Sequence, residues 1–285
     1  MPDGAPPVSA ERDPGLPCRG WADLLAAHLA ERVRAADPSA PAASGGASAA
    51  AGDADPARPG ANAPDPARPG ASAPFRYANL AVRGRLLRPI LRDQLPAALE
   101  LRPDLVSLIG GGNDLLRPLA DPDALAADLE RGVARLREAG VDVLLGTRMN
   151  SADSPVIRRS RGRVAVLNSH VWSIARRYDA YVLDVWGMRS LRDWRMWAPD
   201  RIHLATEGHR RVAQGALVAL GLAPDDAAWD DPLVPLPPLP PAARVRSDAE
   251  WLRVHVYPWA TRRLRGRSSG DLRQPKRPEL LPVEG

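Results

Sequence analysis

Residues 104–114 read Asp-Leu-Val-Ser-Leu-Ile-Gly-Gly-Gly-Asn-Asp, an apolar run that ends in three glycines and two polar side chains. A nearly continuous apolar run of this length is typical of a strand buried on both faces of a parallel sheet. The glycines allow positive φ angles and a close approach of the backbone to a ligand. Ligands of open parallel sheets gather at the carboxyl ends of strands, so Asn113 is a candidate functional residue. Taken alone, the motif also fits an ordinary Asn-Asp turn.

The segments around this stretch alternate between strand and helix patterns. Short connections between alternating strands and helices predict an α/β fold, with a parallel sheet and helices on both faces. Thr206 is the expected N-cap of the last helix in this alternation. The expected strands are 77–82, 104–109, 141–146 and 180–185, and the expected helices are 21–34, 86–101, 121–139, 163–177 and 206–220.

A stretch rich in Ala, Pro, Gly, Ser and Asp interrupts this pattern at residues 37–74. It contains a tandem decamer, DPARPGANAP at 55–64 and DPARPGASAP at 65–74, which differs at one position. Such a composition cannot bury enough apolar surface to offset the entropy lost on ordering. We therefore expect a disordered insertion within a domain that covers residues 1–222.

Residues 223–285 are expected to add a proline-rich linker, a short helix and a basic tail. The linker is extended over 229–243, the helix covers 247–265 with an interruption near Pro258, and the chain after Arg267 is disordered. Between Arg244 and Gly285 the chain carries ten basic and five acidic residues, which account for the whole net charge of +5. A charge excess confined to a tail favours a solvated segment over one that binds nucleic acid or anionic lipid, and we expect no nucleic-acid partner.

The composition also limits the kinds of site. Cys18 is the one cysteine, so no intrachain disulfide or cysteine-rich metal site is possible. The sequence has no metal-binding constellation, phosphate loop or dinucleotide fingerprint, and we expect no cofactor. It has no apolar run long enough to span a bilayer and no signal peptide, so the chain as written is expected to be cytoplasmic.

Asp200 and His203 form a second candidate pair, three residues apart and just before the helix at 206–220. At this spacing the carboxylate can accept a hydrogen bond from the imidazole while the other ring nitrogen faces the site. Asp200 would then orient His203, which acts as general base and general acid. A solvated aspartate and a capping histidine are the alternative for the pair taken alone.

Gly84, then Asn113, then Asp200 and His203 each come after an expected strand, and in this order they resemble the SGNH (GDSL) family of serine ester hydrolases. The resemblance covers residues 1–222, and it includes Arg19-Gly20-Trp21-Ala22-Asp23 and, more loosely, Met1-Pro2-Asp3. It implies a flavodoxin-like three-layer α/β/α fold and a Ser–His–Asp mechanism. In that mechanism Gly84 and Asn113 form the oxyanion hole, and His203 and Asp200 complete the catalytic set.

The nucleophilic serine of this family lies in a Gly-Asp-Ser turn after the first strand, and neither the turn nor an apolar strand is found before Trp21. Three other side chains do not fit the role of nucleophile: Cys18 lies away from the expected turn, Ser9 follows no strand, and Ser107 is expected to pack inside a strand. We expect the gene to start upstream of Met1, with a strand that ends in Gly-Asp-Ser. A chain that starts at Met1 should be poorly soluble and inactive.

Two classes of function follow. The leading hypothesis is an esterase or lipase-like hydrolase that acts on a small-molecule or lipid-like ester, and the alternative is a non-catalytic binding protein with the same fold. The loop with Trp186, Trp194 and Trp197 would line an acyl pocket or contribute to packing. Three further histidines on expected helices, His28, His170 and His209, are expected to be structural.

Overall fold

The computed structural model of the chain describes residues 20–36, 74–150, 157–264, 270 and 273–283. The insertion expected at 37–74 lies outside the described residues except for Pro74, and so do Ser9 and Cys18. Within the described part, no helix is long and apolar enough to cross a membrane.

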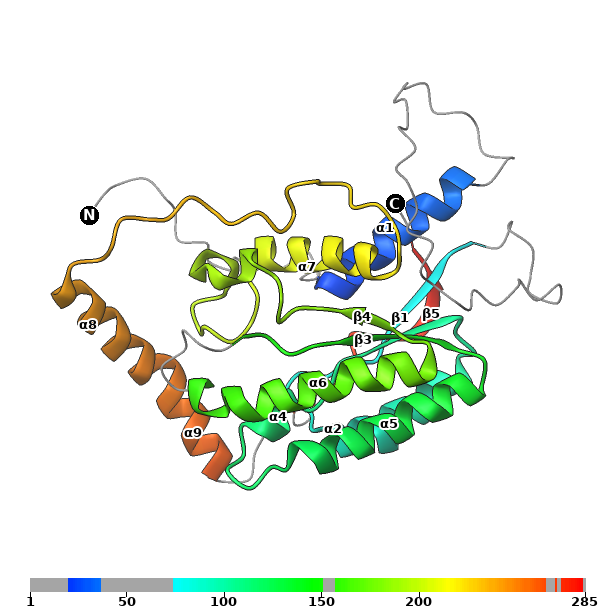
Figure 1. Cartoon of the computed structure of the whole chain (residues 1–285), viewed down its shortest axis with the longest axis horizontal. Helices are drawn as coiled ribbons and strands as arrows, with labels where there is room; N and C mark the ends of the chain where they lie inside the picture. The colour runs from blue at the N-terminus through cyan, green and yellow to red at the C-terminus, as the bar shows by residue number, and fades with distance from the viewer. Residues whose placement is uncertain (1–19, 37–73, 151–156, 265–269, 271–272, 284–285) are drawn as a thin grey trace.

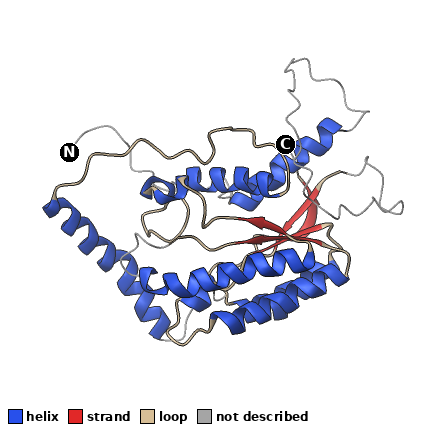
Figure 2. Cartoon of the chain, viewed as in Figure 1, coloured by secondary structure: helices blue, strands red, loops and turns tan. Residues whose placement is uncertain are grey.

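Figures 1 and 2 show an α/β fold in which a small sheet is flanked by helices. The strands are β1 (Arg76–Asn79), β2 (Leu105–Leu108), β3 (Asp142–Gly146), β4 (Tyr181–Leu183) and β5 (Arg277–Pro282). The main α-helices are α1 (Trp21–Ala36), α5 (Pro122–Glu138), α6 (Arg161–Tyr178), α7 (Thr206–Ala219), α8 (Pro241–Trp251) and α9 (Tyr257–Leu264). Shorter helical elements are α2 (Leu87–Pro89), η1 (Ile90–Gln94), α3 (Leu95–Glu100), α4 (Gly112–Leu115), η2 (Ile157–Ser160), η3 (Ser190–Arg192), η4 (Trp194–Met196) and η5 (Leu252–Val256).

The central sheet is parallel and runs in the order β2-β3-β4. Alternate residues of β3 enter two different cores: Val143 and Leu145 pack with the α5–α6 side, and Leu144 packs with the α1–α7 side. All three side chains have no exposed surface. This explains why β3 is apolar without alternation, as expected for a strand covered on both faces. The predicted parallel sheet between helices is confirmed for these three strands.

A second, two-stranded sheet joins distant parts of the chain. β1 pairs antiparallel with β5, and Tyr77 lies opposite Leu281. The expectation of a disordered chain after Arg267 is therefore wrong for the described residues 273–283. Lys276 reinforces the junction, because its ammonium lies 2.5 Å from Asp23 of α1, which also accepts from the Tyr77 hydroxyl at 3.0 Å.

The helix boundaries agree with the prediction to within a few residues, with two informative differences. Thr206 is the first residue of α7, and Ala205 occupies the N-cap position without a capping side chain. In the C-terminal region the helical run starts at Pro241, six residues before the prediction, and it continues through Pro258. The π-helical segment η5 lies directly before α9, and its wider turn accommodates the missing N–H of this proline.

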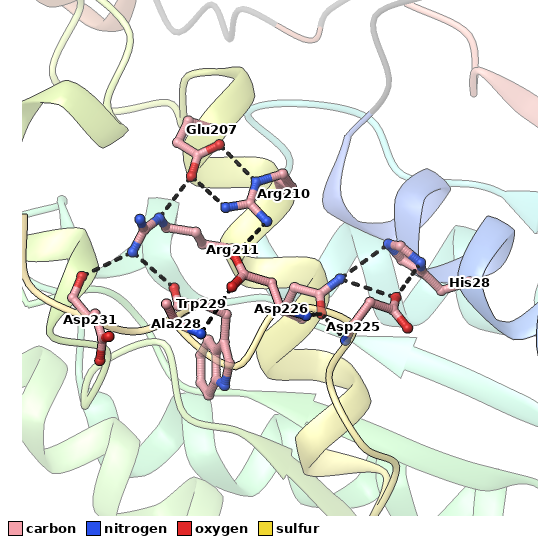
Figure 3. A network of polar contacts seen from close by, with 10 residues as sticks. His28, Glu207, Arg210, Arg211, Asp225, Asp226, Ala228, Trp229 and Asp231 are labelled. Atoms are coloured by element: carbon pink, nitrogen blue, oxygen red, sulfur yellow. Dashed lines mark hydrogen bonds and ion pairs between the residues drawn. The ribbon is translucent and has the colours of Figure 1, made fainter. Parts of the chain in front are cut away.

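An arginine and carboxylate network fastens the chain after α7 to α7 and α1 (Figure 3). Glu207 accepts from both Arg210 and Arg211, and these hydrogen bonds lower the pKa of Glu207 to about 2. On α1, His28 Nδ1 lies 2.8 Å from Asp225. The segment that follows α7 is therefore held against α1.

Close packing at the start of α7 requires a glycine. A Cβ on Gly208 would lie 2.2 Å from the carbonyl oxygen of Met196 in η4, which is backbone and cannot move aside cheaply. Gly162 in the first turn of α6 has open space around the same position. The two glycines thus form a natural pair of test and control positions.

We expect Gly208→Ala to lower the free energy of unfolding by about 1–3 kcal/mol, because the added methyl forces α7 away from η4. Gly162→Ala should raise it by about 0.5–1 kcal/mol, because alanine restricts the unfolded chain more than glycine does. Urea unfolding monitored by circular dichroism measures both. Equal stability of the two variants would contradict the close approach at Gly208.

Candidate active site

The turn after β1 and the turn after β2 are in contact. Gly84 has φ of 75° in the turn after β1, and Gly111 has φ of 92° in the turn after β2. The Asn113 amide nitrogen donates to the Arg85 carbonyl at 3.1 Å, and the Leu87 N–H donates to the Asp114 carboxylate at 3.0 Å. The side chains of the second turn thus hold the first one in place, and the structure brings Gly84 and Asn113 into one region.

Asn113 and Asp114 differ in exposure. Asn113 is exposed, and its amide has two N–H groups, of which one is used by Arg85. Asp114 is buried, and burial raises the pKa of its carboxyl although the hydrogen bond from Leu87 opposes the shift. Asn113 can therefore donate to an oxygen outside the turn, whereas Asp114 supports the turn from inside.

A buried cation lies behind the Gly111 turn, and sequence reasoning missed it. Arg148 follows β3, and Asn168 fixes its backbone by accepting from its N–H and donating to its carbonyl. Its Nη1 donates to the Gly146 carbonyl, while Nε and Nη2 have no hydrogen-bond partner in the described part of the chain. Burial lowers the pKa of this guanidinium to about 10. Arg148 therefore adds positive potential beneath the turn that carries Asn113.

The second part of the site is the loop before α7, which carries Asp200 and His203. Asp200 Oδ2 lies 2.5 Å from His203 Nδ1, and Oδ1 accepts from the N–H groups of Ile202 and His203, each at 3.0 Å. Burial raises the pKa of Asp200, but the His203 ring and the two amides outweigh it and leave the pKa below its ordinary value. The Asp200 carboxylate therefore stays charged and holds the imidazole by Nδ1.

The outer nitrogen of His203 is available for chemistry. The side chain of His203 is half exposed, and its Nε2 has no hydrogen-bond partner among the described residues. With Nδ1 held by Asp200, the neutral ring presents Nε2 as a proton acceptor. The predicted Asp200–His203 contact is thus present.

The loop is closed by backbone hydrogen bonds and by contacts with α8 that the sequence analysis did not find. Ala198 N–H donates to the His203 carbonyl at 2.8 Å. Arg201, at φ of 58°, stacks on Trp251 of α8 at 5.0 Å and pairs with Asp248 at 2.7 Å. The signal in the sequence was weak, because some fifty residues separate α8 from the loop.

The tryptophans of the loop after β4 have separate roles. Trp186 packs against the α5–α6 core, and Trp197 packs against the α1–α7 core while its indole donates to Leu191 at 2.8 Å. Trp194 is 41% exposed and lies 5.8 Å from the Arg201 guanidinium. Two of the three tryptophans therefore contribute to packing, the second of the two roles considered for this loop.

Three further histidines, His28, His170 and His209, have polar partners. His28 contacts Asp225, and His170 Nε2 lies 2.7 Å from Asp123. His209 Nδ1 accepts from the Trp21 N–H at 3.1 Å, and burial lowers the pKa of its imidazole. These contacts hold helices together, in agreement with structural roles.

Among the described residues, the Asn113 side chain makes no hydrogen bond with Asp200 or His203. Ser107 of β2 is exposed, so the expectation that its side chain packs inside the sheet is wrong. No group of three His, Cys, Asp or Glu side chains in the described part is placed to hold a metal ion.

Comparison with known proteins links this arrangement to a family. Among solved structures, the chain is similar to LAE5, an α/β hydrolase from the metagenome of Lake Arreo, with 27% identity over 48% of this chain and 69% of that one and a TM-score of 0.43. It is also similar to a catalytic mutant of an acetylxylan esterase from Geobacillus stearothermophilus, with 21% identity over 49% and 69% of the two chains and a TM-score of 0.41. No curated protein matches the sequence.

The family assignment rests on the sequence match, since both TM-scores are below 0.5. The model of the GDSL-like lipase/acylhydrolase family matches residues 45–211, which is more than half of the chain. This range contains Gly84, Asn113, Asp200 and His203. The chain therefore belongs to the GDSL-like lipase/acylhydrolase family.

Proposed function

We propose that this protein hydrolyses ester bonds by a Ser–His–Asp mechanism, with His203 as general base and Asp200 as its partner. The observation that carries the proposal is the 2.5 Å contact between Asp200 Oδ2 and His203 Nδ1, which leaves Nε2 without a partner among the described residues. An imidazole held in this way accepts a proton from a serine hydroxyl and later returns it to the leaving alcohol.

Asn113 and Gly84 are the proposed oxyanion donors. The attack of a serine on an ester carbonyl places negative charge on the carbonyl oxygen, and fixed N–H donors stabilise that charge. The hydrogen bond from Asn113 to Arg85 fixes the amide and leaves its second N–H for the oxyanion. The backbone N–H of Gly84 is the second donor, and water then releases the acyl group from the serine.

The nucleophile in this proposal is a serine upstream of Met1, at the end of a strand that inserts between β1 and β2. Two features support this position. Among the described strands, β2 pairs with β3 alone and β1 pairs with β5 alone. In addition, Ser107 and Ile109, two residues apart at β2, are exposed. A strand placed there would complete a flavodoxin-like sheet, in which β1, the added strand, β2, β3 and β4 lie side by side in that order.

A non-catalytic binding protein is the second candidate, because the printed sequence contains no Gly-Asp-Ser motif. The two candidates differ in what the gene encodes ahead of Met1 and in turnover by the full-length protein. An in-frame stop codon directly upstream, together with a folded and soluble product from Met1, would favour the binding protein.

In the full-length protein, His203→Ala should lower kcat for p-nitrophenyl acetate by about 10³-fold or more, because the serine loses its general base. Asn113→Ala should lower kcat by about 10²–10³-fold through the loss of one oxyanion donor. Steady-state kinetics measure both effects.

His170→Ala is the matched control, since His170 also contacts an aspartate but lies on the outer surface of α6. It should keep wild-type turnover. Wild-type activity in His203→Ala would refute the proposed mechanism.

Asp200→Asn should lower turnover strongly, and it also gives a test by pH. The folded-state pKa of Asp200 is below its value of 3.8 in the unfolded chain, so the carboxylate stabilises the fold above that pH and the contribution is lost as the pH falls through the folded pKa. Relative to wild type, the variant should lose about 1.5–3 kcal/mol of unfolding free energy near neutral pH. The difference should shrink steadily below pH 3.8 in urea titrations, and a constant difference across this range would exclude the charged carboxylate as its source.

A further inference from the structure

Helix α8 reaches the loop of Asp200 and His203 through one face. Ser247, Asp248 and Trp251 all contact this loop, and Asp248 and Trp251 are three residues apart, a spacing that puts them on the same side of a helix. Trp251 is the one buried residue in α8, with 4% of its surface exposed. Figure 1 shows the α8–α9 run along one end of the molecule.

Trp251 binds the loop at the catalytic aspartate itself. The indole Nε1 donates to the backbone carbonyl of Asp200 at 3.0 Å, and the Arg201 guanidinium lies 5.0 Å from the centre of the indole ring. The Asp200 side chain uses both of its oxygens on the loop and on the His203 ring. Asp200 thus contacts His203 through its carboxylate and Trp251 of α8 through its backbone carbonyl.

Arg201 has an unfavourable backbone conformation that these contacts maintain. Its φ of 58° lies in the left-handed region, where the Cβ of any residue other than glycine is crowded. This conformation turns the chain so that the Ile202 and His203 N–H groups both point at Asp200 Oδ1. Two rings and one carboxylate hold the side chain: Trp194, Trp251 and Asp248.

We propose that Trp251 and Asp248 are positioning residues for His203, which act by holding Asp200 and Arg201 in the turn that aims the imidazole. The inference rests on the proposed function. It gives α8, which lies outside the residues that match the family model, a part in the same reaction. Neither residue touches the reacting atoms. Their loss should therefore reduce kcat, which depends on the orientation of His203, and leave KM for a small ester unchanged.

The first experiment compares Trp251→Phe with Trp172→Phe in the full-length protein. Phenylalanine keeps an aromatic ring under Arg201 and removes the N–H donor to Asp200. We expect kcat for p-nitrophenyl acetate to fall about tenfold at unchanged KM. The low-field proton resonance of His203 Nδ1–H should also broaden or disappear. Trp172 is 46% exposed on α6, and its replacement should change neither quantity.

The second experiment tests the role of the left-handed turn by a double-mutant cycle. Asp248→Ala removes the ion pair to Arg201 from the surface of α8 and should lower kcat severalfold without unfolding the protein. Arg201→Gly removes both the side chain and the steric cost of positive φ. In an Arg201→Gly background, Asp248→Ala should therefore have no further effect on kcat, and the coupling between the two positions measures the positioning role.

The outcomes separate this inference from the proposed function. If His203→Ala retains turnover, the proposed function itself fails. If His203→Ala abolishes turnover while Trp251→Phe and Asp248→Ala keep wild-type kcat and the His203 proton resonance, the positioning role alone is refuted. A loss of kcat that follows only the thermal unfolding midpoint, with additive effects of Arg201→Gly and Asp248→Ala, also refutes it, because it assigns both residues to general stability.

Discussion

Burial of β3 on both faces is the constraint on which the rest of the structure depends. Val143 and Leu145 face α5 and α6, and Leu144 faces α1 and α7, so neither helical layer can be removed without exposing the strand. Because the strands on either side of β3 run parallel to it, they end at the same edge as β3. The turns and loops that follow β2, β3 and β4 therefore carry Asn113, Arg148 and the Asp200–His203 pair.

The parts of the fold that sequence predicts are those that local pattern controls. The strands around 104–109 and 141–146 are apolar runs of strand length, and α5 begins with Asp121, which caps the Asp123 N–H, and Pro122 at the first helical position. β5 has no such signal, because its sequence Arg-Pro-Glu-Leu-Leu-Pro contains two prolines. It forms at a sheet edge through pairing with β1, a partner that only the tertiary structure supplies.

The candidate site also has contacts that sequence predicts and contacts that depend on the tertiary structure. Asp200 and His203 are three residues apart, so their contact depends on one turn, and sequence suffices to predict it. Asn113 and Arg85 are twenty-eight residues apart, and their hydrogen bond is a property of the assembled edge. Arg148 and Trp251 left only a weak sequence signal, because an arginine after a strand and a tryptophan in a helix have many common explanations. Burial alone distinguishes them, with 8% and 4% of their surfaces exposed.

The pairing of β1 with β5 also bears on how the chain is made. Arg76 and Leu280, which are hydrogen-bonded across this sheet, are 204 residues apart. At about 5–20 residues per second, a ribosome needs roughly 10–40 s to add that length of chain. During this time β1 has an open edge that can pair with other chains. Pairing over so long a separation is also slow to form, so the final residues of the chain decide when this part of the molecule is protected from aggregation.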